Sequence, residues 1–185
     1  MTKTIIKDKA VMMEEIRTLI SEGKTVTLTV KGNSMNPFVV HMRDQMTLGP
    51  WKDEDICKGA VALVKDTKNN YLIHRIIKRE NNIVTLLGDG NIRITETATL
   101  ENVIGLMHSI TRKGVCHTRK SRLWRFYSAV WMFLTPIRRL PLGIWRRLNR
   151  DKIFLTNIGP AVPKKHAAAA TGTNSGSEDN GNLTS

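Results

Sequence analysis

Ser34 lies in a short polar segment, residues 31–37, that directly follows an alternating run from Thr25 to Val30. Alternation of side chains with a period of two predicts a β-strand, and Gly32 and Asn33 tolerate the backbone of a tight turn. A serine hydroxyl at the end of a strand is well presented for chemistry. Because it is almost wholly protonated near neutral pH, it needs a base to act as a nucleophile.

His74 is the best candidate for that base. It lies in the β-branched segment from Tyr71 to Ile77, where alternation places it on one face with Leu72 and Ile76. A neutral imidazole can take a proton from serine and later return it to a leaving amine. A lone histidine on such a face is more often structural, so the pair by itself is a weak signal of catalysis.

Further segments strengthen the signal, and they follow one another along the chain as Gly32–Pro37, Arg43–Leu48, Lys58–Val64, His74–Ile76 and Gly88–Asn91. Together they resemble the ordered boxes of the signal peptidase and SOS-repressor superfamily of serine peptidases. The resemblance covers Thr25 to Ile110 and implies a mainly β protease domain with Ser34 as nucleophile and His74 as general base. A histidine at this place, where bacterial leader peptidases carry lysine, is similar to the endoplasmic-reticulum branch and its bacterial relatives.

A triad also needs a group that holds the imidazole in the correct tautomer. By the same resemblance the candidate is Asp89, on the glycine-containing turn at residues 88–91. Endoplasmic-reticulum relatives carry further aspartates shortly after this turn, whereas here Glu96 is the first acid that follows. Asp89 is therefore interpreted either as the orienting acid or as a turn-forming residue without a catalytic role.

The oxyanion hole also departs from the family pattern. Many leader peptidases use a hydroxyl two residues before the nucleophile, but that position is Gly32 here. The resemblance to the repressor branch implies that the backbone N–H groups of Ser34 and Asn33 stabilise the oxyanion. It also implies that Met35 and Pro37 help to shape the walls of the substrate cleft, although both residue types are equally suited to core packing.

The elements that would position these residues are mostly strands. Apolar residues at helical spacing predict a helix from Asp8 to Glu22, ended by Gly23. Strands are predicted at residues 25–30, 45–48, 60–65, 71–78, 83–87 and 102–109, and the third and fourth of these form a hairpin. The predicted fold is mainly β, a signal-peptidase-like or repressor-protease-like β domain with a short N-terminal helix and a C-terminal helical appendage.

The charge is very unevenly distributed. The formal net charge is +13, and residues 111–152 carry 12 Lys+Arg but one acid, whereas residues 1–110 carry 15 and 13. Cys57 and Cys116 have no metal-ligand spacing and imply no disulfide framework, so they are interpreted as free thiols. No metal or other cofactor is predicted.

The basic segment also contains Trp124, Trp131 and Trp145. Its uncharged run from Phe126 to Ile137 has 12 residues, whereas a transmembrane helix needs about 20. Three interpretations remain, and the favoured one is an interfacial helix pair on anionic lipid. The second is a nucleic-acid surface, in which the large aliphatic side chains would have no partner. The third is a helix packed on the protease domain or on a second subunit.

Four segments are thus predicted: an N-terminal helix (1–24), the protease domain (25–113), a basic amphipathic and membrane-associated helical segment (114–152), and a disordered tail (153–185). No signal peptide is predicted, because Ile5 and Ile6 are followed by charged residues. We expect peripheral association with the cytoplasmic side of a membrane, with a cytoplasmic location as the alternative.

The leading hypothesis is a serine endopeptidase that cleaves an extended signal or leader peptide. A non-enzymatic peptide-binding module of the same fold is the second hypothesis, favoured by Gly32 and by the missing acids after Asp89. A self-cleaving, repressor-like regulator is the third, and it is ranked lowest because the N-terminal segment is too short for a DNA-binding domain. Nucleic acid is not an expected partner, and the sequence leaves the oligomeric state open.

Overall fold

The computed structural model describes residues 9–149. Its first element is α1 (Lys9–Ser21), which buries Met13, Ile16 and Ile20 against the sheet. Gly23 ends the helix with a φ of +82°, and the N–H groups of Gly23 and Lys24 donate to carbonyls of its last turns. The predicted N-terminal helix is confirmed within this range.

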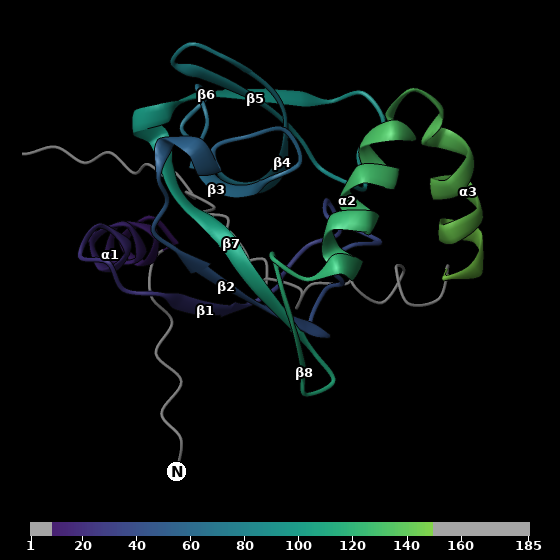
Figure 1. Cartoon of the computed structure of the whole chain (residues 1–185), viewed down its shortest axis with the longest axis horizontal. Coiled ribbons are helices and arrows are strands. Elements are labelled where there is room, and N and C mark those ends of the chain that lie inside the picture. Colours follow the sequence, from purple (N-terminus) through teal and green to yellow (C-terminus); the bar gives the residue numbers. More distant parts are fainter. Residues whose placement is uncertain (1–8, 150–185) are drawn as a thin grey trace, which may run out of the picture.

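Eight strands form one antiparallel sheet. Figure 1 labels them along the chain. They are β1 (Val26–Thr29), β2 (Asp44–Gly49), β3 (Val61–Lys65), β4 (Tyr71–Glu80), β5 (Ile83–Leu87), β6 (Thr95–Thr99), β7 (Val103–Arg112) and β8 (Val115–Thr118). The strand order is β1-β2-β7-β3-β4-β5-β6, and β8 pairs with the end of β7. The mainly β fold is confirmed, and β6 and β8 are strands that the sequence analysis did not predict.

Both faces of the sheet are covered, which explains why β3 is buried at nearly every position. The buried apolar residues form two hydrophobic clusters, and alternate residues of β3 belong to different ones. Val61 and Leu63 pack in the cluster that includes α1, whereas Ala62 and Val64 pack in the second cluster. The same alternation holds in β4, where Ile73 belongs with the first cluster and Ile76 with the second. The central strands are therefore fixed in register by burial on both sides.

Short 3₁₀ turns connect parts of the sheet at Asp53–Asp55 and Leu100–Asn102. Beyond β8 the chain forms α2 (Arg122–Phe133), a 3₁₀ turn at Thr135–Ile137, and α3 (Arg139–Leu148). The helical C-terminal appendage is thus confirmed, although the sheet continues to Thr118, past the predicted domain end at residue 113. The predicted tail at 153–185 lies outside the described residues.

The helices lie at the two ends of the molecule's long axis, α1 at one end and the pair α2 and α3 at the other (Figure 1). Ser121 caps α2 by accepting a hydrogen bond from the backbone N–H of Trp124. Phe38, from the segment after Ser34, packs edge-on against Trp124 and stacks on Tyr127, with ring centroids 4.9 and 4.8 Å apart. The appendage therefore packs directly on the segment that follows the candidate nucleophile.

Candidate active site

Ser34 is exposed on a loop between β1 and β2. Gly32 has a φ of +107°, a conformation that glycine adopts readily, and its N–H donates to Nδ1 of His41 over 2.8 Å. On the other side of Ser34, the Asn36 side-chain amide donates to Oδ1 of Asn33 over 2.9 Å. The loop is thus held by its own polar groups around the serine, as the predicted tight turn requires.

The turn at residues 88–91 packs on the backbone of this loop. The N–H of Gly90 donates to the carbonyl oxygen of Ser34 over 2.8 Å. A Cβ atom built on Gly88 would lie 2.5 Å from that same oxygen, and one built on Gly90 would lie 2.6 Å from the carbonyl oxygen of Asn33. Both glycines are therefore required by close approach of two backbone segments.

His74 reaches the same turn from β4. Arg75 is paired with Leu87 across β4 and β5, so Gly88 follows on from the end of β5 beside His74. A Cβ atom on Gly88 would lie 2.9 Å from Nε2 of the His74 ring. The His74 side chain is 6 % exposed, and this nitrogen lies beside the turn that packs on the Ser34 loop. The structure thus brings the two predicted residues, Ser34 and His74, to one turn.

The other ring nitrogen of His74 meets Glu96. Nδ1 of His74 lies 2.9 Å from Oε2 of the Glu96 carboxylate. The strand register explains this contact. Ile76 in β4 is paired with Leu86 in β5, and Leu86 is paired with Glu96 in β6, so Glu96 lies on the face that His74 shares with Ile76. An acid on β6 therefore lies at the ring nitrogen that an orienting acid would contact.

Asp89 is not the acid that contacts His74, contrary to the first of its two interpretations. Both of its carboxylate oxygens accept hydrogen bonds from Arg75, over 2.8 and 2.6 Å, and both side chains are 1 % exposed. Arg75 neighbours His74 in β4 but points to the opposite face of the strand. The alternation along β4 thus separates Asp89 from the imidazole and places its carboxylate in a buried ion pair with Arg75.

Arg75 links this ion pair to its surroundings. Its Nη1 donates to the carbonyl oxygen of Gly59 over 2.7 Å and to Oγ of Ser128 in α2 over 2.8 Å. Its guanidinium carbon lies 4.6 Å from the centre of the Phe38 ring, a cation–π distance. One buried arginine therefore joins the turn at 88–91, the sheet, the serine loop segment and α2.

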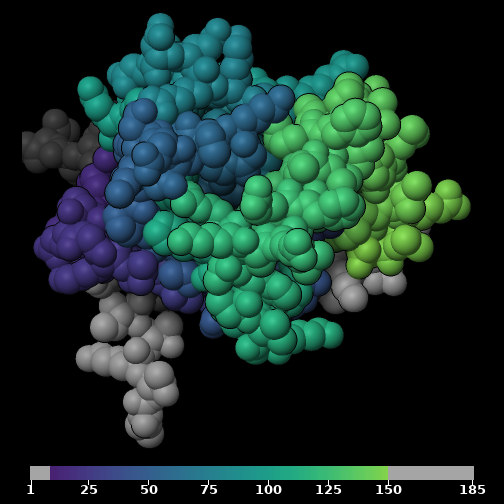
Figure 2. Space-filling model, viewed as in Figure 1, coloured from purple at the N-terminus to yellow at the C-terminus, as the bar shows by residue number. Residues whose placement is uncertain are grey.

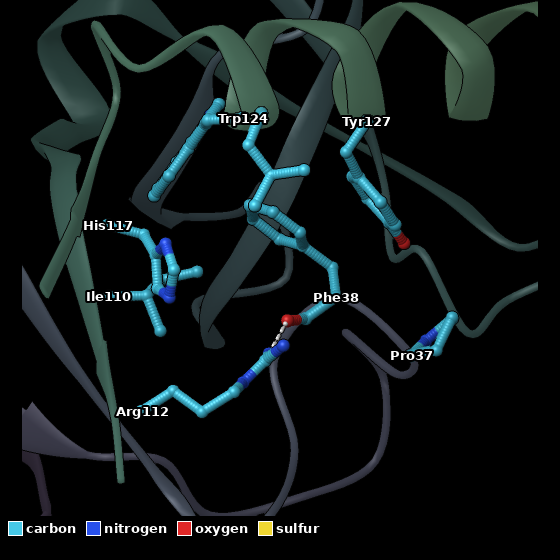
Figure 3. Close-up of a pocket in the computed structure, with 8 residues that line it drawn as sticks. Pro37, Phe38, Ile110, Arg112, His117, Trp124 and Tyr127 are labelled. Atoms are coloured by element: carbon cyan, nitrogen blue, oxygen red, sulfur yellow. Dashed lines mark hydrogen bonds between the residues drawn. The ribbon is translucent and has the colours of Figure 1, made fainter. Parts of the chain in front are cut away.

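The other residues predicted around the site fall in different environments. Met35 is 3 % exposed within the hydrophobic core, which favours packing over contact with a substrate. Pro37 lines a pocket of about 240 Å³ between the serine loop, β7, β8 and α2, shown in Figure 3. Of the two residues whose backbone N–H groups are expected as oxyanion donors, Ser34 is exposed and Asn33 is half-buried.

The segment after Phe38 is anchored by the buried carboxylate of Asp44. Burial alone would raise the pKa of Asp44, but hydrogen bonds from Arg43, Arg112 and the N–H of Val40 outweigh it and hold that pKa far below its usual value. Arg112 also donates to the carbonyl oxygen of Phe38 over 2.7 Å (Figure 3). The loop that carries Ser34 is therefore fixed at its far end by a charged cluster.

Two arginines of the appendage fix the turn at 88–91 from outside. Arg138 is 1 % exposed and donates to the carbonyl oxygens of Gly88 and Asn91 over 3.3 and 3.1 Å. Arg146 in α3 donates to the carbonyl oxygen of Gly90 over 2.7 Å. The turn thus has the serine loop and His74 on its inner side and arginine donors from the helices on its outer side.

Among residues 9–149 no cluster of three or more His, Cys, Asp or Glu side chains could hold a metal ion. Cys57 and Cys116 are both exposed and free. With the geometry established, comparison with known proteins adds no precedent: the chain matches no protein-family description, no curated protein and no solved structure.

Proposed function

We propose that this protein is a serine endopeptidase of signal-peptidase type, in which Ser34 is the nucleophile, His74 the general base and Glu96 the orienting acid. The observation that supports the proposal is the placement of the His74 ring. Its Nδ1 lies 2.9 Å from Oε2 of Glu96, and its Nε2 lies beside Gly88, where an added Cβ atom would be 2.5 Å from the carbonyl oxygen of Ser34.

This placement suits proton transfer. A Glu96 carboxylate that accepts a hydrogen bond from Nδ1–H leaves the lone pair on Nε2, which is the nitrogen on the side of the serine loop. Nε2 would take the Ser34 proton as the hydroxyl attacks the scissile carbonyl, and Glu96 would stabilise the imidazolium that forms. Nε2 would then return the proton to the leaving amine, and water would release the acyl group from Ser34.

The substrate would be an extended peptide. β1 is an edge strand of the sheet, and the chain passes from it directly into the Ser34 loop. A peptide added along this edge would gain main-chain hydrogen bonds and bring its scissile bond near Ser34. The oxyanion would be stabilised by the N–H groups of Ser34 and Asn33, as the resemblance to the repressor branch implies. The N–H of Gly32 donates to His41 instead.

Labelling with a serine-reactive peptide phosphonate tests this proposal. We expect wild type to be labelled at Ser34, Ser34→Ala and His74→Ala to lose labelling, and Glu96→Gln to be labelled about 10²- to 10⁴-fold more slowly. Ser21→Ala, which removes an exposed hydroxyl from the end of α1, is the matched control and keeps the wild-type rate. Absence of labelling in a folded wild type across neutral pH would refute catalysis and favour the peptide-binding module.

A further inference from the structure

The two C-terminal helices expose an unusual concentration of apolar side chains. Of the 14 large hydrophobic residues exposed within residues 9–149, eight lie in α2, α3 and the turn between them. These eight, defined here as the apolar stripe, are Leu123, Phe126, Val130, Phe133, Ile137, Leu140, Ile144 and Leu148. Their exposures range from 38 % for Val130 to 80 % for Phe133, so the domain does not cover them.

The stripe follows the helical repeat. Leu123, Phe126, Val130 and Phe133 are spaced by three or four residues along α2, and the stripe residues of α3 are spaced by four. The opposite side of each helix is the one that packs on the domain, through Trp124 and Trp131 in α2 and Leu142 in α3. Each helix therefore has two apolar sides, one packed on the domain and one exposed to solvent.

The charged residues of the segment that contains the stripe have a single sign. Residues 111–149 contain ten Lys and Arg and no Asp or Glu. Arg122, Arg125, Arg139 and Arg147 are exposed on the same two helices. In Figure 2 these helices, coloured green to yellow, form one side of the molecular surface. The open apolar face is thus flanked by cations on its own helices, whereas the acids Glu54 and Asp55 line a pocket beside Arg125 on the side of α2 that faces the domain.

We propose that the helix pair α2 and α3 docks this stripe into the surface of an anionic lipid bilayer. Amphipathic helices that lie in such an interface bury apolar side chains among acyl chains and place arginines at the phosphates. None of the helices within residues 9–149 is long and apolar enough to cross a membrane. Lying in the surface is the arrangement that uses both the stripe and the arginines.

Other occupants fit less well. Two copies of this chain that met through the stripe would bring like charges together, because a two-fold interface uses the same patch on both subunits. A nucleic acid would pair with the arginines but would leave eight apolar side chains in water. An anionic bilayer satisfies both features at once.

The test is flotation of full-length Ser34→Ala protein with vesicles, so that binding is measured without any catalysis. We expect binding to vesicles that contain phosphatidylcholine and phosphatidylglycerol, and much weaker binding to phosphatidylcholine alone. Phe126→Ser with Phe133→Ser should weaken binding about 100-fold, from roughly 10-fold for each phenylalanine. Arg139→Gln with Arg147→Gln should weaken it about 30-fold, and on the anionic vesicles only.

The matched control is Ile83→Ser with Ile94→Ser, which removes two apolar side chains that are 50 % and 69 % exposed on the sheet domain. It should bind like the parent protein, and circular dichroism should show every variant folded. Equal losses in the two apolar variants, or no vesicle binding by a folded parent, would overturn the proposal. Binding of RNA without binding of vesicles, or a stripe-dependent dimer, would overturn it in favour of that partner. Phosphonate labelling is a separate readout, so failure here leaves the proposed peptidase activity standing.

Discussion

Replacing Asp89 with asparagine tests whether this residue has a structural role, as the contacts indicate. Asp89 and Arg75 are joined by hydrogen bonds of 2.8 and 2.6 Å, and each side chain is 1 % exposed. Removing one partner of such a buried pair leaves the other charge uncompensated, which typically destabilises a protein by about 3–5 kcal/mol. Because Arg75 keeps its bonds to Gly59 and Ser128, we expect the lower end of that range, about 3 kcal/mol.

The assay is urea and thermal unfolding followed by circular dichroism. A loss of about 3 kcal/mol corresponds to a decrease of roughly 6–12 °C in the midpoint for a protein of this size. Asp53→Asn is the matched control: it also removes a carboxylate that pairs with an arginine, but its side chain is 74 % exposed. That change should cost about 1 kcal/mol or less.

Two results would refute the structural role of Asp89. One is equal destabilisation by Asp89→Asn and Asp53→Asn, which would mean that the buried pair contributes no more than an exposed one. The other is an Asp89→Asn protein of wild-type stability whose phosphonate labelling is lost, because that outcome would make Asp89 the orienting acid. Combining Arg75→Met with Asp89→Leu should cost less than either change alone, since no buried charge remains unpaired.

Two further predictions concern the serine loop. Gly88→Ala would place a Cβ atom 2.5 Å from the carbonyl oxygen of Ser34 and displace the loop, so we expect phosphonate labelling to fall about 10²-fold. Gly143→Ala is the control, because a Cβ atom there would meet nothing within 4 Å, and this variant should be labelled at the wild-type rate. The folded-state pKa of Asp44 lies below its unfolded value of about 3.9, so its stabilisation is complete above that pH and is lost as the pH falls. Chemical unfolding between about pH 5 and pH 2 should therefore show a steeper loss of stability for wild type than for Asp44→Asn; parallel curves would contradict this.

The sequence predicts the parts of the site that lie on strongly patterned strands. His74 is flanked by alternating apolar residues, and Ser34 follows a strand and a glycine turn, so both could be placed on elements in advance. Glu96 could not, because β6 contains one buried apolar residue, Ala98, and forms an edge of the sheet. Such a strand has little hydrophobic periodicity, and the alternation of threonines around Glu96 is the one local signal that could have revealed it.

Buried charged side chains are the other feature that the pattern of residues along the sequence could not reveal. Arg75 and Arg138 are each 1 % exposed, although single arginines in a sequence are expected to be solvated. Their partners, Asp89 for the first and the carbonyls of residues 88 and 91 for the second, are distant in sequence and meet them only through the sheet register and the docking of the helices. Asp89 could therefore be singled out from its place on a turn, whereas its pairing with Arg75, and that of His74 with Glu96, could not be predicted.

The contacts of Arg138 and Arg146 have a consequence for how the chain can be divided. A fragment that ended at Thr118 would leave the carbonyls of Gly88 and Gly90 without their arginine donors and would expose the ring of Phe38 to water. The helices are therefore part of the fold and not a detachable appendage of a self-sufficient sheet domain. Residues 9–149 should therefore unfold as one cooperative unit. Replacing the helices by a foreign membrane anchor would remove the contacts that hold the turn at 88–91 and would distort the site.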